Sequence, residues 1–468
     1  MYQDMFRREK EATLVMTECI EDRFEFASVQ GTREVVAEFS GGTISSDGGG
    51  LLLQETDSKI NLLARFSQCF LDGRNPTLIE HSVEQMVRQR VYGLALGYED
   101  LNDHDQLRQD PLLGLMAGKA EPGAELLAGK STLNRMELGT GIATRYKKIT
   151  YWRDSVDELL VNVFLEAHKE APARIVLDID TTDMALHGNQ EGRFFHGYYG
   201  HYCYLPLYIF CGEHVLCARL RPSNVGPAVG SKKEVERIVT QIRQRWPEVK
   251  IILRGDSGFC ADEIMTWCEE HRVEFVIGMA RNKRLESLVA EPLAEAQRQF
   301  ESTQQPARVF VEFQHQTLSG SWNRKRRVVA KAEHIDGKSN PRFIVTSVDA
   351  EKWDKQKLYE ELYCARGDME NRIKEQFVLF ADRVSASTMR ANQLRIYFSV
   401  MAYSLLNGLR RVGLRATALA TAQVGTIRLR LLKIGALVRV TVRKVWVRMA
   451  SSYPYQALFS QVLRQLRS

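Results

Sequence analysis

The hydrophobic and polar residues follow a helical period in the first third of the chain. Within residues 81–96, Val83, Met86, Val87, Val91 and Leu94 recur at spacings of three and four, which places them on one face of a helix. Residues 51–66 show a similar apolar face, and the sequence S-T-L-N-R at 131–135 is typical of an N-cap that opens a further helix. We therefore predict a helical N-terminal domain over residues 1–145.

From residue 174 the pattern changes to alternating strands and helices. Strands are predicted over 175–179, 194–211, 215–220, 249–253 and 273–278, with helices over 232–246 and 261–271. The order βββαβαβ, in which an early antiparallel sheet is followed by a parallel pair, is the ribonuclease H-like arrangement. The predicted fold class is therefore α/β, and residues 146–285 form the first part of this core.

The pattern of apolar and polar residues changes again between residues 286 and 354. Three segments, at 307–313, 326–333 and 341–347, alternate apolar and polar residues, as antiparallel strands with one solvent-facing side do. We interpret 286–354 as a β-rich insertion that interrupts the core. Helical patterns resume over 355–410, the second part of the core, and residues 411–468 form a basic C-terminal region.

The charge is distributed unevenly along the chain. The net charge of +6 combines 64 basic with 58 acidic residues, but residues 383–468 contain 15 Lys/Arg and no Asp or Glu. A region with this balance predicts binding to nucleic acid. In the N-terminal domain, Asn134 and Arg135 would face phosphates or bases from the predicted helix. The helices there are equally compatible with an ordinary helical bundle.

Composition limits the cellular context. The longest mostly apolar run, at 396–409, is too short to span a bilayer, and the first ten residues show no signal peptide. None of the eight cysteines forms a C-x-x-C pair, so reduced thiols are expected. We expect a cytoplasmic protein that has no contact with a membrane.

Three carboxylates close the apolar segment I-V-L-D-I-D-T-T-D at 175–183. Asp178 and Asp180 point to the same side of a strand, and ionised carboxylates there require a cation or another partner. The alternative is a strand that runs into a turn, where Asp and Thr are common. Asp183 fits that turn.

Asp256 has the same character at the end of the strand 249–253, in R-G-D-S-G-F. In the proposed sheet, Asp180 and Asp256 leave neighbouring strands at the same edge. Two carboxylates there can bind divalent cations, and oxygen ligands favour Mg²⁺ or Mn²⁺ over Zn²⁺. A simple Asp-Ser-Gly turn is the alternative for Asp256.

A third group lies on the helix predicted after the insertion. Tyr363, Arg366, Glu370 and Lys374 fall on one helical stripe in Y-C-A-R-G-D-M-E-N-R-I-K. A salt-bridged surface helix would show the same spacing.

Together these motifs resemble the DDE transposases of bacterial insertion sequences, of the kind with a β-rich insertion before the last acidic residue. The matching segments are D-I-D-T-T-D with H-G-N-Q-E-G-R-F-F-H-G-Y-Y, then L-R-G-D-S-G-F, then Y-x-x-R-x-x-x-E. The similarity extends from about residue 45 to 455.

The resemblance implies the roles of several residues. Asp180, Asp256 and Glu370 would be the catalytic, metal-binding acids, with Asp178 supporting Asp180 and Glu375 a rival of Glu370. Tyr363 and Arg366 would bind phosphates of the transposon end. The family's lysine position is Phe377 here, so Lys374 is the substitute. Trp322 in the insertion is a candidate to hold a flipped base, although it could instead cover the sheet.

The resemblance also implies a reaction and partners. Metal-activated water would cleave a phosphodiester at the element's end, and the freed 3′-hydroxyl would attack target DNA. The expected partner is double-stranded DNA bound by a homodimer. A structure-selective nuclease on the same fold and a catalytically silent DNA-binding repressor are the alternatives. A zinc site at His187, His196, His201 and Cys203 is not favoured, because a strand would split them between faces.

Overall fold

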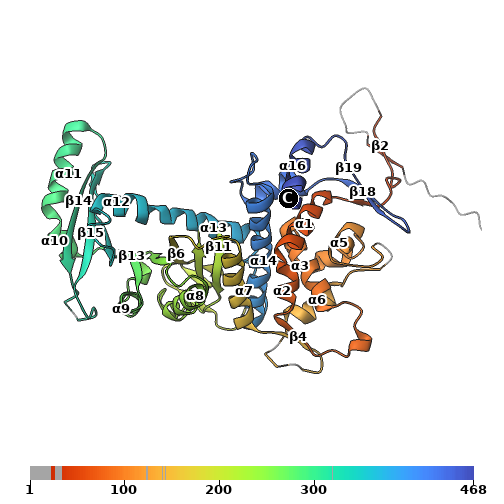
Figure 1. The fold of residues 1–468 in the computed structure, drawn as a ribbon, viewed down its shortest axis with the longest axis horizontal. Helices are drawn as coiled ribbons and strands as arrows, with labels where there is room; N and C mark the ends of the chain where they lie inside the picture. Colours follow the sequence, from red (N-terminus) through yellow and green to blue (C-terminus); the bar gives the residue numbers. More distant parts are fainter. Residues whose placement is uncertain (1–22, 27–33, 123–124, 140, 143, 319) are drawn as a thin grey trace, which may run out of the picture.

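The computed structural model describes residues 23–26, 34–122, 125–139, 141–142, 144–318 and 320–468. The molecule is elongated, with a helical part at one end and a mixed sheet that runs to the other end (Figure 1). Helix α14 (Met389–Gly413) stands between the two parts. The first 22 residues of the predicted N-terminal domain lie outside the described residues.

The N-terminal part is helical, as the apolar periodicity predicts. Its main helices are α1 (Leu51–Ile60), α2 (Leu62–Ser67), α3 (Val83–Leu96), α5 (Pro111–Met116) and α6 (Lys130–Glu137). Helix α7 (Arg153–Glu166) lies on the sheet side of α14 (Figure 1) and packs against strand β11 (His214–Arg219). Helix α3 begins at a capping box, in which the side chains of Ser82 and Gln85 accept hydrogen bonds from each other's backbone N–H groups. It ends at Gly97, whose φ of 101° favours glycine. The predicted apolar face of this helix is largely buried.

Five strands form the part of the sheet that carries the acidic residues. They are β6 (Arg174–Thr181), β10 (Leu207–Cys211), β11 (His214–Arg219), β12 (Lys250–Gly255) and β13 (Val273–Met279). Their order is β11, β10, β6, β12, β13; β10 is antiparallel to both neighbours, whereas β12 is parallel to both of its own. Helix α8 (Ser231–Arg245) leads from β11 to β12, and α9 (Asp262–Glu270) connects the parallel pair β12 and β13. The predicted antiparallel and parallel strand directions are confirmed.

The aromatic-rich segment predicted as one strand over 194–211 is divided into three. Strands β8 (Phe194–His196) and β9 (His201–Tyr204) form a small separate sheet with β7 (Met184–Ala185), and only β10 joins the main sheet. The break before β10 falls at Pro206, because proline has no N–H to donate to a strand ladder. The first strand of this small sheet, β7, begins three residues after the end of β6.

The segment predicted as an insertion extends the main sheet. It contains α10 (Lys283–Leu288), α11 (Ala290–Thr303), β14 (Ala307–His315), β15 (Arg326–Ile335), β16 (Lys338–Ser339) and β17 (Arg342–Thr346). Strand β17 pairs with β13, β15 with β17 and β14 with β15, so a nine-stranded sheet reaches the far end of the molecule (Figure 1). In space, the segment predicted as an insertion thus continues the main sheet.

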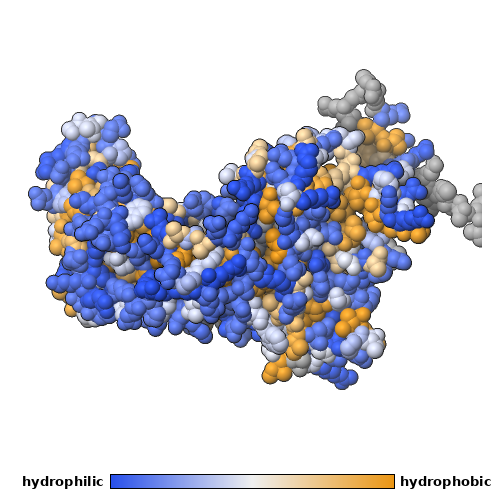
Figure 2. Space-filling model, viewed as in Figure 1, coloured by the Kyte–Doolittle hydropathy of each residue, from blue (hydrophilic) through white to orange (hydrophobic). Residues whose placement is uncertain are grey.

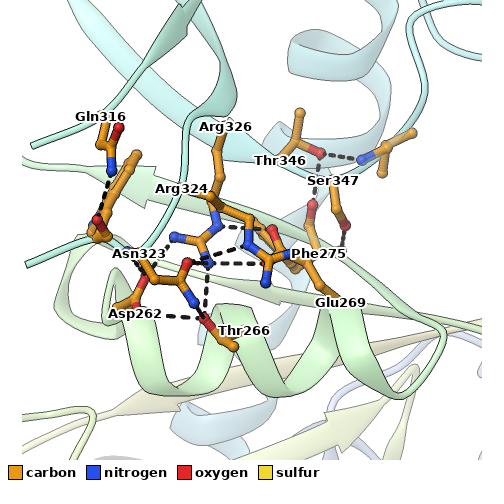
Figure 3. Close-up of polar contacts among 12 residues, drawn as sticks. Asp262, Thr266, Glu269, Phe275, Gln316, Asn323, Arg324, Arg326, Thr346 and Ser347 are labelled. Carbon is orange, nitrogen blue, oxygen red and sulfur yellow. Dashed lines mark hydrogen bonds and ion pairs between the residues drawn. The ribbon is translucent and has the colours of Figure 1, made fainter.

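Arg326 fastens the loop between β14 and β15 to α9 (Figure 3). Its guanidinium lies 2.6 Å from Asp262 and 2.8 Å from Glu269, and it donates a hydrogen bond to Thr266. Trp322 in the same loop is 4% exposed, with Arg326 over its ring. Burial leaves no free ring face for a flipped base, so the interpretation that Trp322 covers the sheet is the one that fits.

A helical segment brings the chain back from the far end. It comprises α12 (Lys355–Lys357), a π-helical turn over Leu358–Tyr363, a 3-10 turn over Cys364–Arg366 and α13 (Gly367–Val378). It runs along the sheet toward α14 (Figure 1). Figure 2 shows that the outline of the molecule is concave above this segment and that the surface there is mostly hydrophilic.

The C-terminal region folds back on the N-terminal helices. Helix α16 (Gln456–Arg467) packs against α1 and α14, and the hairpin of β18 (Ala436–Val440) and β19 (Val445–Met449) pairs with β3 (Ile44–Ser45). At Gly49, a Cβ atom would lie 1.9 Å from the carbonyl oxygen of Leu431, so the close approach requires glycine. Among the described residues, no helix combines the length and apolar character needed to cross a membrane.

Candidate active site

Asp180 lies at the carboxyl end of β6, in the middle of the sheet. One carboxylate oxygen accepts a hydrogen bond from the backbone N–H of Thr181 at 2.8 Å, and the other lies 2.8 Å from the guanidinium of Arg366. Asp180 is 8% exposed. Burial raises the pKa of its carboxyl to about 6; Arg366 lowers this pKa and the charge of Asp256 raises it. Burial therefore disfavours the ionised form of Asp180, and the positive charge of Arg366 favours it.

Asp256 leaves the neighbouring strand at the same edge. Because β12 is parallel to β6 with Gly255 opposite Ile179, Asp256 and Asp180 follow matched positions. One oxygen of Asp256 accepts the N–H of Gly258 at 2.9 Å and caps a 3-10 turn. The Asp-Ser-Gly turn is therefore present, and it holds the carboxylate at the edge where Asp180 ends its strand.

Arg366 links the third acidic residue to this edge. Its guanidinium lies 2.8 Å from Asp180 and 3.4 Å from Glu370. The π-helical and 3-10 turns before Gly367 interrupt the regular helix that the spacing predicted. Arg366 and Glu370 nevertheless lie on one side of the helical segment at the start of α13. Glu370 is therefore connected to Asp180 through the Arg366 guanidinium and not by direct contact between the two carboxylates.

Tyr363 reaches the site over β13. A Cβ atom at Gly278 would lie 2.6 Å from the Tyr363 hydroxyl and 2.9 Å from the backbone nitrogen of Ser257. Burial raises the pKa of the Tyr363 phenol, while Arg366 lowers it. Gly278 was missed in the sequence analysis, although a glycine inside an apolar strand is a signal of close approach. Its missing side chain provides the space for the Tyr363 hydroxyl.

Asp178 is bound by Arg254, its register partner on β12. The Arg254 Nε and Nη2 atoms lie 2.5 and 2.7 Å from the two carboxylate oxygens, and Nη1 donates to the carbonyl of Leu362. Asp178 therefore helps the site by joining the sheet to the helical segment that carries Tyr363. Sequence reasoning did not use Arg254, whose signal is a lone arginine in the apolar run I-I-L-R-G.

Sequence comparison identifies the family. The family model described as "Transposase DDE domain group 1" matches residues 27–468, which is nearly the whole chain. The chain belongs to the DDE transposase family. Among solved structures, the cryo-EM structure of the piggyBac transposase synaptic complex with hairpin DNA is similar at 11% identity and a TM-score of 0.37, over 83% of this chain and 80% of that one. No curated protein sequence matches this transposase.

DDE transposases in general depend on a divalent metal, and the oxygen donors here fit one. Asp180 and Asp256 supply carboxylates at one edge of the sheet, the ligand type that Mg²⁺ prefers. Across the described part of the transposase, no three His, Cys, Asp or Glu side chains gather as a metal site. Glu370 is linked to Asp180 only through the Arg366 guanidinium. Asp180 and Asp256 are the residues that could hold such an ion, whereas Glu370 is paired with Arg366.

The other predicted residues of the transposase occupy several different places. Lys374 is exposed on α13, one turn after Glu370, whereas Asn134 and Arg135 are exposed on α6 in the helical part. Asp183 lies 2.8 Å from His201. Glu375, the rival of Glu370, is buried between Arg372 at 3.0 Å and Arg410 at 2.8 Å, which gives it a structural role.

Proposed function

We propose that this protein is a DNA transposase whose active site contains Asp180, Asp256 and Glu370. The observation that carries the proposal is the placement of the two aspartates at one edge of neighbouring parallel strands, with Arg366 linking Asp180 to Glu370. The strand order, in which three antiparallel strands are followed by two parallel ones, supports a ribonuclease H-like core. The reaction is hydrolysis of a phosphodiester at the element's end, followed by strand transfer to target DNA.

Asp180 and Asp256 would hold Mg²⁺ or Mn²⁺, which when bound would supply activation of the attacking oxygen and charge stabilisation at phosphorus. The chain's own residues fix the geometry around this position. The Gly258 N–H orients Asp256, and the Thr181 N–H orients Asp180. Because these donors belong to the backbone, both carboxylates are held in place before DNA binds.

Arg366, Tyr363 and Lys374 are proposed to bind phosphates beside the scissile bond. Arg366 now donates to two carboxylates, and a DNA phosphate is an oxyanion that competes for the same N–H groups. Transfer of the guanidinium from Asp180 and Glu370 to phosphate would release both carboxylates at the moment DNA arrives.

The C-terminal region is proposed to bind the DNA backbone. On the exposed face of the β18–β19 hairpin, Arg439 lies opposite Trp446 and Leu437 opposite Arg448. Within the part of the chain that the structure describes, neither arginine has an ion-pair partner, and residues 383–468 contain no acidic residue. Two-stranded ribbons of this kind enter DNA grooves. Asn134 and Arg135 on α6 are proposed as further contacts.

The resemblance of the motifs to insertion-sequence transposases extends the proposal to the biological setting. The element would be a bacterial insertion sequence, and the protein would act in the cytoplasm. A homodimer on DNA is proposed because the two ends of an element must be processed together.

The test is incubation of the protein and Mg²⁺ with DNA that carries the element's inverted repeats. Strand-transfer products are expected. Cutting without joining would indicate a structure-selective nuclease, and binding alone a repressor. Asp180→Asn, Asp256→Asn and Glu370→Gln should each abolish cleavage and keep DNA binding, whereas Asp368→Asn, on the same helix as Glu370, should retain cleavage.

A further inference from the structure

The hairpin formed by β8 and β9, residues 193–202, carries an unusual number of exposed rings, and we refer to it as the aromatic hairpin. Phe195 is 58% exposed, Tyr198 87% and Tyr202 42%. Single exposed rings are common on protein surfaces, but a contiguous patch of exposed rings usually marks an interaction site. None of these rings has a role in the proposed chemistry.

The aromatic hairpin stands beside the candidate catalytic carboxylates. Strand β7 begins four residues after Asp180 and pairs with β9, which pairs with β8. His201 on β9 lies 2.8 Å from Asp183, which follows Asp180 by three residues at the end of β6. The aromatic hairpin is therefore attached to the chain that directly follows Asp180.

One face of the aromatic hairpin combines rings with a cation. Phe195 and Tyr202 are register partners, and their rings meet edge-to-face at 5.6 Å. The Arg193 guanidinium lies 4.2 Å from the centre of the Tyr202 ring. Rings for stacking beside an arginine for phosphate are the groups with which proteins bind unpaired nucleotides irrespective of sequence.

The aromatic hairpin is also held in a fixed shape. The N–H of Gly200, at a φ of 73°, donates to the carbonyl of His196 at 2.8 Å and closes the turn that displays Tyr198. The Ser223 hydroxyl donates to the carbonyl of Phe194. A fixed surface loses little conformational freedom when a base stacks on it.

We propose that the aromatic hairpin binds unpaired nucleobases next to the cleaved phosphodiester, and this rests on the proposed transposase function. Asp180 is 8% exposed, which favours access by a strand that leaves the regular duplex. Bases that lose their stacking neighbours there find replacement partners on Phe195, Tyr198 and Tyr202. The ligand is single-stranded DNA, whose negative charge the Arg193 guanidinium complements.

The test measures binding of a fluorescent twenty-nucleotide oligothymidine by anisotropy, in buffer with EDTA so that no cleavage occurs. Phe195→Ala/Tyr202→Ala should weaken binding roughly tenfold or more, and binding of a blunt duplex should change less than twofold. Phe195→Trp/Tyr202→Trp should retain binding, which separates stacking from misfolding. The matched control is Tyr146→Ala, because Tyr146 is 76% exposed with Arg145 5.5 Å over its ring but lies in the helical part.

An equal loss in the Tyr146 variant, or no loss in the double alanine variant, would overturn the proposal. A change of oligomeric state in sedimentation without a change in oligothymidine binding would make the surface a protein interface and would overturn it as well. A protein that binds the oligonucleotide through these rings but cleaves no DNA would therefore support this site and refute the transposase function separately.

Discussion

The guanidinium of Arg366 lies 2.8 Å from the carboxylate of Asp180, a residue 186 positions earlier in the chain. We expect Arg366→Ala to lower the free energy of unfolding by about 1–3 kcal/mol at pH 7, because it leaves a largely buried carboxylate without its cation. Urea denaturation measures this difference. In an Asp180→Asn background the same change should have a smaller effect, and equal effects in both backgrounds would show that the pair does not contribute.

The ion pair of Asp178 and Arg254 is more deeply buried than that of Asp180 and Arg366. We therefore expect its removal to reduce the stability of the fold. Asp178→Ala should lower the free energy of unfolding by about 3–5 kcal/mol, since it leaves the Arg254 charge buried and unpaired. Asp178→Leu/Arg254→Met should recover most of this loss. If Asp178→Ala instead abolished cleavage with no change in stability, Asp178 would belong among the metal ligands.

Gly278→Ala is expected to displace the Tyr363 hydroxyl, because the new methyl group would lie 2.6 Å from it. Cleavage should fall roughly tenfold or more, since a small displacement of a positioning group has large effects on rate. Tyr363→Phe in the same background should relieve part of the crowding, which thermal denaturation can detect. The relief should be incomplete, because the Ser257 backbone nitrogen lies only 2.9 Å from the same position.

If the β18–β19 hairpin binds the DNA backbone as proposed, its arginines should contribute to the salt dependence of duplex binding. Arg439→Gln/Arg448→Gln should weaken duplex binding at any sequence and reduce the slope of log K against log salt by about 2, one counterion per lost phosphate contact. Fluorescence anisotropy at several salt concentrations measures the slope. Lys283→Gln/Arg298→Gln removes two cations at the opposite end of the molecule, near α10 and α11 (Figure 1). An equal change in that control would mean that the hairpin has no special role.

Two histidines, the buried His104 and the partly exposed His214, make stability depend on pH. Burial lowers the pKa of His104 and that of His214 to about 3 each, so neither binds a proton in the folded state at pH 5, whereas both do when unfolded. Stability should therefore fall as pH decreases below 6.5, by up to about 2 kcal/mol per histidine at pH 5. His104→Gln should remove its share of this dependence, which urea denaturation at pH 5 and pH 7 measures.

The local elements were readable from the sequence because their signals are local. Period-two and period-3.6 patterns located β6, β12, β13 and α8 to within a few residues. The aspartates could be placed at one sheet edge because parallel strands end at the same side. The single strand predicted over 194–211 failed because Pro206 and the glycines of the turn outweigh the β-forming aromatic residues.

The long-range contacts were not readable in this way. Pairing of β13 with β17 joins residues about seventy positions apart, and no local pattern encodes it. The same holds for Arg254, whose partner Asp178 is identified only by the register of two strands. Trp322 was a candidate to hold a flipped base or to cover the sheet, and only the contact of Arg326 with α9, which buries that loop, decides between them.

The continuation of the sheet through β17, β15 and β14 fixes a length along the molecule. Five strand spacings separate β6 from β14, which is roughly 24 Å at about 4.8 Å for each spacing. Successive phosphates on one DNA strand are spaced about 3.4 Å along the axis, so this span matches about seven base pairs. A strand added to or removed from this segment would leave the chemistry of the carboxylates intact and shift, by one or two base pairs, the point where a bound duplex meets the far edge of the protein.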